Sequence, residues 1–140
     1  MMHVLYAVLL AALALILPGC ATSGGETLKI DTRNVVGIQY MPDELTRMLR
    51  ELGYQWIPIV DPEIEREVKT VQKQGYYSMR FELVETRQVR IDARMRIQDG
   101  FTRLHFYEPG SQTLSPSAMD LFQELQKRAW LEFGQTNVSR

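Results

Sequence analysis

Two stretches near the middle of the chain alternate strictly between apolar and polar residues. Apolar side chains occupy every odd position from 77 to 83, and again from 89 to 97. A period of two is typical of strands that bury one face and expose the other. Asp99-Gly100 follows the second stretch closely and is a strong signal for a two-residue hairpin turn. The pattern therefore predicts antiparallel strands on both sides of this turn.

Apolar residues recur at helical spacing in two other stretches. The first, 42–52, begins with a proline and two acidic residues and stops at Gly53, which predicts an amphipathic helix. The second follows Ser115-Pro116, a cap followed by a first-turn proline, and runs to a stop near Gly134. We therefore expect two amphipathic helices, one before the alternating strands and one after them.

Three further stretches are less regular. Residues rich in β-formers within 27–40 predict a first strand. The aromatic stretch 54–60 predicts an edge strand, because Pro58 cannot donate a hydrogen bond to a neighbouring strand. Residues 62–74 favour a helix, with a strand as the alternative because several of them are β-branched.

Together these elements predict an α+β fold. We expect an antiparallel meander of about four to five strands, with two or three helices packed on one face. The predicted domain, 27–136, has a length typical of single domains, which run to about 100–150 residues. The residues expected to meet in its core are Phe81, Ile91 and Phe106 on the sheet and Phe122 and Leu125 on the last helix.

The start of the chain has a different character. An apolar run, Val4–Leu17, leads into Leu17-Pro18-Gly19-Cys20. The run has 14 residues, fewer than the ~18–20 that cross a bilayer as a helix, and it fits the apolar part of a signal peptide. This segment resembles the lipobox of bacterial lipoproteins, in which the cysteine receives a diacylglyceryl thioether before cleavage on its amino side.

The resemblance implies a signal peptide over 1–19 and a lipidated Cys20, followed by a flexible tether that extends to residue 26. Since no aspartate follows Cys20, it also implies delivery to the periplasmic face of the outer membrane, where acyl chains such as palmitate hold the protein. The alternative interpretation is a simple secretory signal followed by an ordinary cysteine.

Composition limits the chemistry of the exported domain. Lys and Arg total 16 against 17 for Asp and Glu, so the chain has no overall bias toward nucleic acid or toward an anionic membrane, and any electrostatic preference must be local. A single cysteine makes no internal disulfide. His105 is the one histidine beyond the signal segment, so Ser-His-Asp, Cys-His and multi-histidine metal sites are not predicted once Cys20 is lipidated. We therefore expect a protein that is not an enzyme and holds no cofactor or metal.

The polar face of the alternating strands is rich in arginine. A two-residue turn at Asp99-Gly100 sets Met95 opposite Leu104 and Ala93 opposite Phe106. This places Arg96 opposite Arg103 and Arg94 opposite His105. Directly opposed like charges are destabilising in a sheet, whereas neighbouring guanidinium groups suit phosphate or carboxylate ligands. The predicted anionic-ligand site consists of Arg80, Arg90, Arg94, Arg96, Arg103 and His105.

Cross-strand ion pairs are the alternative interpretation of these arginines. If about five residues connect the first two alternating strands, Arg80 faces Asp92 and Glu82 faces Arg90. Solvated pairs of this kind then explain half of the cluster without any ligand. A third possibility is that another protein, or the membrane surface, covers the face.

These observations predict a non-enzymatic lipoprotein of the bacterial envelope. The leading interpretation is an interaction or assembly accessory, anchored in the outer membrane, with an envelope protein as its partner. The alternative is a module that binds an anionic lipid or lipopolysaccharide through the arginine-rich face. A hydrolase is the third interpretation.

Overall fold

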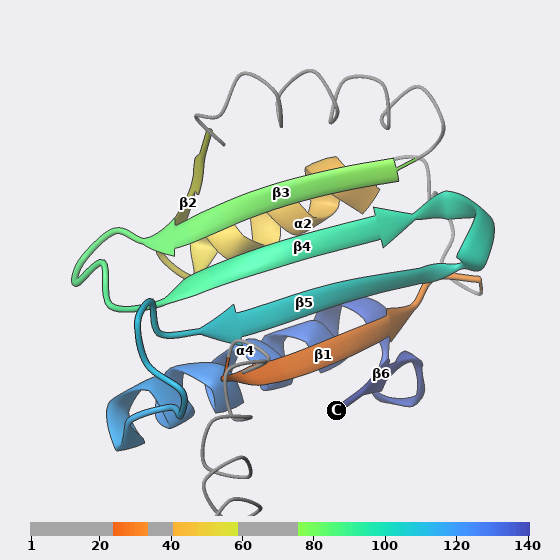
Figure 1. Ribbon diagram of the computed structural model, residues 1–140. Coiled ribbons are helices and arrows are strands. Elements are labelled where there is room, and N and C mark those ends of the chain that lie inside the picture. The colour runs from red at the N-terminus through yellow and green to blue at the C-terminus, as the bar shows by residue number, and fades with distance from the viewer. Residues whose placement is uncertain (1–23, 34–40, 59–75) are drawn as a thin grey trace, which may run out of the picture.

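The computed structural model describes residues 24–33, 41–58 and 76–140. They form an antiparallel sheet of six strands in the order β2-β3-β4-β5-β1-β6 (Figure 1). The strands are β1 (Glu26–Asp31), β2 (Tyr54–Ile57), β3 (Tyr76–Leu83), β4 (Arg90–Arg96), β5 (Phe101–Tyr107) and β6 (Val138–Ser139).

Two α-helices of the described chain lie on one face of this sheet, behind it in Figure 1. They are α2 (Met41–Glu51) and α4 (Pro116–Phe133). Residues 76–140 also contain two short 3-10 turns, η3 (Ile97–Asp99) and η4 (Gln135–Asn137). The α+β class and both predicted amphipathic helices are confirmed.

The strand count differs from the expected four to five. β2, β3, β4 and β5 form a meander, and the first strand predicted within 27–40 is present as β1, which lies beside β5. The sixth strand, β6 beside β1, was not predicted. The strand predicted over 54–60 is confirmed as the edge strand β2, which ends at Ile57 just before Pro58. The segment 62–74, for which helix and strand were both considered, lies outside the described residues.

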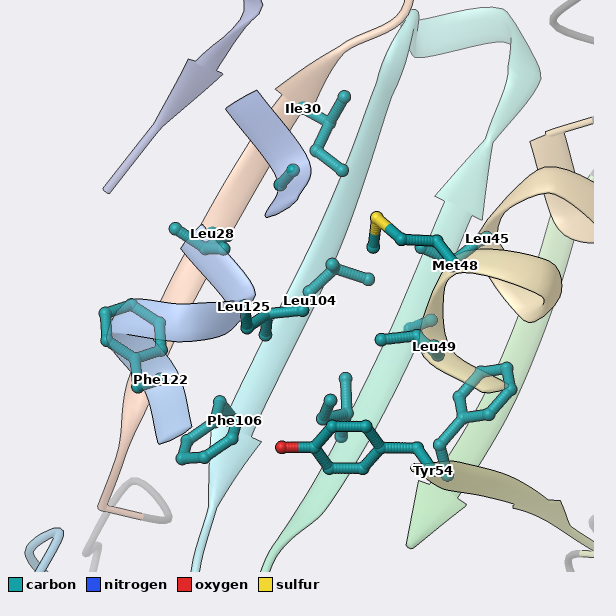
Figure 2. Close-up of a cluster of buried hydrophobic side chains, with 14 of the residues drawn as sticks. Leu28, Ile30, Leu45, Met48, Leu49, Tyr54, Leu104, Phe106, Phe122 and Leu125 are labelled. Carbon is teal, nitrogen blue, oxygen red and sulfur yellow. The ribbon is translucent and has the colours of Figure 1, made fainter. Parts of the chain in front are cut away.

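The core lies between the sheet and the two helices. Phe81, Ile91 and Phe106 point from the sheet into this layer and are at most 1% exposed. Phe122 and Leu125 of α4 are fully buried above them, and the rings of Phe106 and Phe122 have centroids 5.6 Å apart (Figure 2). The predicted core is confirmed. Alternation in the strands places one set of apolar side chains on the sheet face that α4 covers, and helical spacing places the apolar side chains of α4 toward that face.

The helix α2 contributes the other half of this layer. Leu45, Met48 and Leu49 lie on its buried face and meet the sheet side chains seen in Figure 2. On its outer side, Arg47 contacts Glu51 at 2.9 Å and Glu132 of α4 at 2.8 Å. Exposed ion pairs contribute little individually, so burial of the apolar faces accounts for most of the attachment of α2.

The first turn of α4 is closed by side chains. The Ser115 hydroxyl accepts a hydrogen bond from the Ala118 backbone N–H at 3.3 Å. The Glu108 carboxylate accepts the Ser115 backbone N–H, which lowers the pKa of Glu108 below its usual value. Gln88, from the β3–β4 connection, donates to both the Ser115 hydroxyl and Glu108.

Replacement of the cap residue tests this arrangement. We expect Ser115→Ala to lower the free energy of unfolding by about 1 kcal/mol, because a helix donor loses its acceptor. Urea denaturation followed by circular dichroism measures the difference. Gln123→Ala, on the exposed side of the same helix, is the control and should stay within about 0.5 kcal/mol of the wild type. An equal loss in both variants would show that the cap is not the cause.

The register between β4 and β5 differs from the predicted one by two residues. Ala93 pairs with Leu104, whereas Phe106 was its expected partner. Met95 pairs with Thr102, whereas Leu104 was expected. The reason is that η3 lies between the strands, so the connection is longer than a two-residue turn. A shift of two residues keeps every side chain on its face, which is why the predicted core survives the error.

The connection is fixed from outside the hairpin. Gly100 has φ of +70°, and its carbonyl accepts the Thr32 backbone N–H at 2.8 Å. A Cβ at Gly100 would lie 2.4 Å from the Arg33 side chain. The end of β1 therefore shapes this turn, and a local turn signal could not include that influence.

The sheet extends beyond the predicted domain limits of 27 and 136. A Cβ at Gly24 would lie 1.5 Å from the Gln112 carbonyl oxygen, so this glycine packs closely against another part of the domain. β1 begins at Glu26, directly after Gly25 with φ of +137°. At the other end, Val138 is buried and pairs with Ile30 of β1.

Candidate functional site

The face of the sheet opposite α2 and α4 carries the candidate residues, and no helix of the described residues covers it (Figure 1). In β3, β4 and β5 every second side chain points into the core, so the residues between them point to this open face. The six predicted ligand-binding residues all belong to it, whereas Cys20 lies outside the described residues. They are Arg80 on β3, Arg90, Arg94 and Arg96 on β4, and Arg103 and His105 on β5.

Two of these six residues are neutralised by carboxylates of the same face. Arg80 stands opposite Asp92 and donates two hydrogen bonds to its carboxylate, at 2.8 and 3.1 Å. Arg90 stands opposite Glu82 and donates at 3.1 Å. The cross-strand pairs considered as the alternative interpretation are therefore present, and these two arginines have structural partners.

Asp92 also has a second neighbour. The Tyr107 hydroxyl donates a hydrogen bond to its Oδ1 at 3.3 Å. Burial raises the pKa of Tyr107, and the negative charge of Asp92 adds to this effect. The same carboxylate raises the pKa of Arg80. Asp92 therefore joins Arg80 and Tyr107 in one polar cluster on the open face.

The longer β4–β5 connection changes the partners of Arg96 and His105. Arg96 lies opposite Phe101, so its predicted position opposite Arg103 is wrong, and its Nη1 donates to Asp99 at 3.0 Å. His105 lies between Asp92 and Thr27 in the neighbouring strands, so its predicted position opposite Arg94 is also wrong.

His105 belongs to the packing of the open face. Its Nδ1 lies 3.1 Å from the Thr27 hydroxyl. Its ring stacks on that of Tyr107, with centroids 5.3 Å apart and an angle of 18° between the planes. These contacts hold the imidazole in a defined position on the sheet.

Two arginines remain opposite each other. Arg94 of β4 directly faces Arg103 of β5, and Lys29 of β1 faces Arg103 from the other side. These three residues, which we name the basic row, form one line across three neighbouring strands. Arg94 and Arg103 are exposed, and neither makes an ion pair with any residue that the structure describes. Over the parts of the chain that the structure describes, the row therefore concentrates positive charge that no ion pair of Arg94 or Arg103 balances.

Lys29, at one end of the basic row, lies over the aromatic ring of Phe101. Its ammonium lies 3.8 Å from the centroid of Phe101, and the Arg33 guanidinium lies 5.0 Å from the same ring. Arg33 also binds the nearby Asp31 carboxylate, which lowers the pKa of Asp31 to about 2. Lys29 adds a weaker attraction to Asp31, whose oxygens are already occupied by Arg33.

Sequence reasoning did not include Lys29 in the site. Its position between the buried Leu28 and Ile30 places it on the polar face of a strand. The alternation of this short stretch carried that information, but nothing in it indicated that β1 pairs with β5, far along the chain. Only the strand order brings Lys29 beside Arg103.

The described residues offer little to other kinds of chemistry. They contain no group of three or more His, Cys, Asp or Glu side chains placed to hold a metal ion. Within the same parts of the chain, no helix is long and apolar enough to cross a membrane. A cavity lined by Met41, Met95 and Phe101 has a volume of about 10 Å³, which is room for a single water molecule.

Comparison with models of protein families, with curated proteins and with solved structures finds no match to this chain. The function of the open face therefore has to follow from its own residues. Among the described residues, that face combines ion pairs and aromatic rings with a local excess of positive charge at the basic row.

Proposed function

We propose that this protein is a non-enzymatic lipoprotein of the bacterial envelope, held by Cys20 on the periplasmic face of the outer membrane. It acts as an interaction or assembly accessory and contacts its partner through the open face of the sheet. The lipobox-like segment before Cys20 supports the anchor. The open face supports the interaction.

The observation that supports an interaction is the asymmetry of the sheet. One face is closed by α2 and α4 and contains the apolar core. The other face holds aromatic rings, ion pairs and the basic row, and the row gains nothing for the fold because its like charges repel. A row of like charges becomes favourable when a complementary surface or ligand neutralises it.

A non-enzymatic role agrees with the side chains that the chain provides. With Cys20 lipidated, His105 is the one imidazole left in the mature chain. Its ring lies beside the Thr27 hydroxyl and stacks on the ring of Tyr107.

Site-directed photo-cross-linking in cells tests the interaction face. A benzophenone amino acid at Thr27 or Ser78 projects from the open face, and the same group at Gln123 or Lys127 projects from the exposed side of α4. We expect adducts with one envelope protein from the open-face positions and none from the α4 positions. Adducts from α4 alone, or from neither face, would contradict the proposed function.

A second candidate function is binding of an anionic ligand. It is favoured by one observation, the direct opposition of Arg94 and Arg103 without an ion pair to either among the described residues. Guanidinium groups placed side by side suit bidentate contact with phosphate or carboxylate oxygens.

A further inference from the structure

We propose that the basic row, Lys29, Arg94 and Arg103, is a binding site for the phosphate group of an anionic lipid headgroup. This inference deepens the proposed function and rests on it for the location of the domain at a membrane. It names a smaller set than the arginine-rich face as a whole, and it adds a lysine from β1.

The first argument concerns the carboxylates around the row. Asp92 is held by Arg80, and Glu82 is held by Arg90. Asp99 is held by Arg96, and Asp31 is held by Arg33. Each of these four carboxylates is therefore already occupied by an arginine outside the row. Within the described part of the open face, the remaining positive charge lies on one line of three residues.

The second argument concerns the match in size and charge. Neighbouring strands are about 4.8 Å apart, so the backbone positions of Lys29 and Arg94 are about 10 Å apart, with Arg103 between them. Long side chains at that spacing can converge on one group. A phosphomonoester carries a charge of about −1.5 to −2 and three acceptor oxygens, so it balances the row better than one carboxylate.

The third argument concerns the surface around the row. Phe101 lies beside it and positions the Lys29 ammonium over its ring. The flanking pairs Arg80–Asp92 and Arg90–Glu82 are neutral. A protein that binds membranes through diffuse charge has a broad basic surface, whereas this face concentrates its unbalanced charge at one place. The site therefore fits a single headgroup.

The fourth argument concerns the source of the phosphate. Gly24 packs against the backbone of Gln112, so the domain begins only four residues after Cys20. Four residues reach at most about 14 Å when fully extended. If Cys20 is lipidated, the domain stays at the bilayer surface, where phosphate occurs in lipid headgroups. This selects a lipid over a soluble phosphate compound.

Calorimetric titration of the full-length protein, purified from membranes in a maltoside detergent, tests the site. The probe is dihexanoylphosphatidic acid, and the comparison probes are inorganic phosphate and a hexaglutamate peptide. We expect the lipid probe to bind most tightly, with an affinity that falls as salt is added. Replacement of all three residues (Lys29→Gln, Arg94→Gln, Arg103→Gln) should weaken binding at least about tenfold, because hydrogen bonds to charged groups contribute strongly.

The matched control removes three positive charges elsewhere. Arg50, Arg87 and Lys127 are exposed and lie outside the basic row, and replacing them with glutamine should leave the affinity within about twofold, since exposed charges far from the site are screened. The triple variant of the row should unfold at the same temperature as the wild type or a higher one, because a repulsion has been removed. The single variants Arg94→Gln and Arg103→Gln give a second measurement if the triple variant does not fold.

Each other outcome overturns the inference. Equal weakening by the control variant would mean diffuse charge attraction. Tighter binding of hexaglutamate than of the lipid would assign the row to an acidic protein segment. Equal affinity for inorganic phosphate would remove the lipid as the source. None of these results changes the cross-linking from Thr27 and Ser78 or the labelling of Cys20, so failure of this inference can be distinguished from failure of the proposed function.

Discussion

Replacement of Phe106 by alanine should lower the free energy of unfolding by about 3–5 kcal/mol, the usual cost of removing a buried aromatic ring. Phe106 is fully buried, stands opposite Ile91 in β4, and packs against Phe122 of α4. Its loss would open a cavity between the sheet and the helix. Since small domains are stabilised by only about 5–15 kcal/mol, this change removes a large share of the total.

Phe101 provides the matched control for this variant. It belongs to the same strand, but its side chain lies on the open face and is only partly buried. We expect Phe101→Ala to cost clearly less than Phe106→Ala, because removing a partly exposed ring loses less buried apolar area. Urea denaturation of the detergent-purified protein, followed by circular dichroism, measures both. Equal losses at positions 101 and 106 would mean that the two faces of β5 have been assigned wrongly.

The local elements of this fold follow from the sequence because their signals are local. Strict alternation in β3 and β4 fixes which side chains are buried, and the cap at Ser115 with the stop at Gly134 fixes the limits of α4. These patterns depend on neighbours in the chain. They identify the core without any knowledge of the strand order.

The places of β1 and β6 in the sheet and the β4–β5 register could not be predicted from the sequence. β1 pairs with β5 because Leu28 and Ile30 complete the apolar layer beneath α4, a contact between distant parts of the chain. The register depends on η3 and on the hydrogen bond from Thr32 to Gly100. Both are tertiary influences, and a two-residue turn signal cannot include them.

The difference between local patterns and tertiary contacts also explains which features of the site could be predicted. Alternation placed all six candidate residues on one face, and the cross-strand pairs of Arg80 and Arg90 were expected as one interpretation. Because the register is shifted by two residues, Arg94 stands opposite Arg103, and Arg96 forms an ion pair with Asp99. The face could be predicted from local pattern, whereas the choice of partners across it required the register.

Replacement of Cys20 by serine should abolish acylation and release most of the protein from the membrane fraction, or leave it unprocessed. One acyl chain gives only marginal membrane binding, whereas the diacylglyceryl group and N-acyl chain expected at Cys20 together anchor a protein stably. Metabolic labelling with an alkynyl palmitate analogue, followed by separation of membrane and soluble fractions, measures both effects. Thr22→Ser, two residues further along the chain, is the control and should be labelled and retained like the wild type.

The combination of the two measurements separates the possible forms of attachment. Equal labelling of Cys20→Ser and the wild type would remove the lipoprotein proposal. Loss of label with full retention at the membrane would instead mean that an uncleaved signal segment or the basic row holds the protein there. A salt wash decides between these two, because the attraction of Lys29, Arg94 and Arg103 to headgroup phosphates is screened by salt and the insertion of an apolar segment is not.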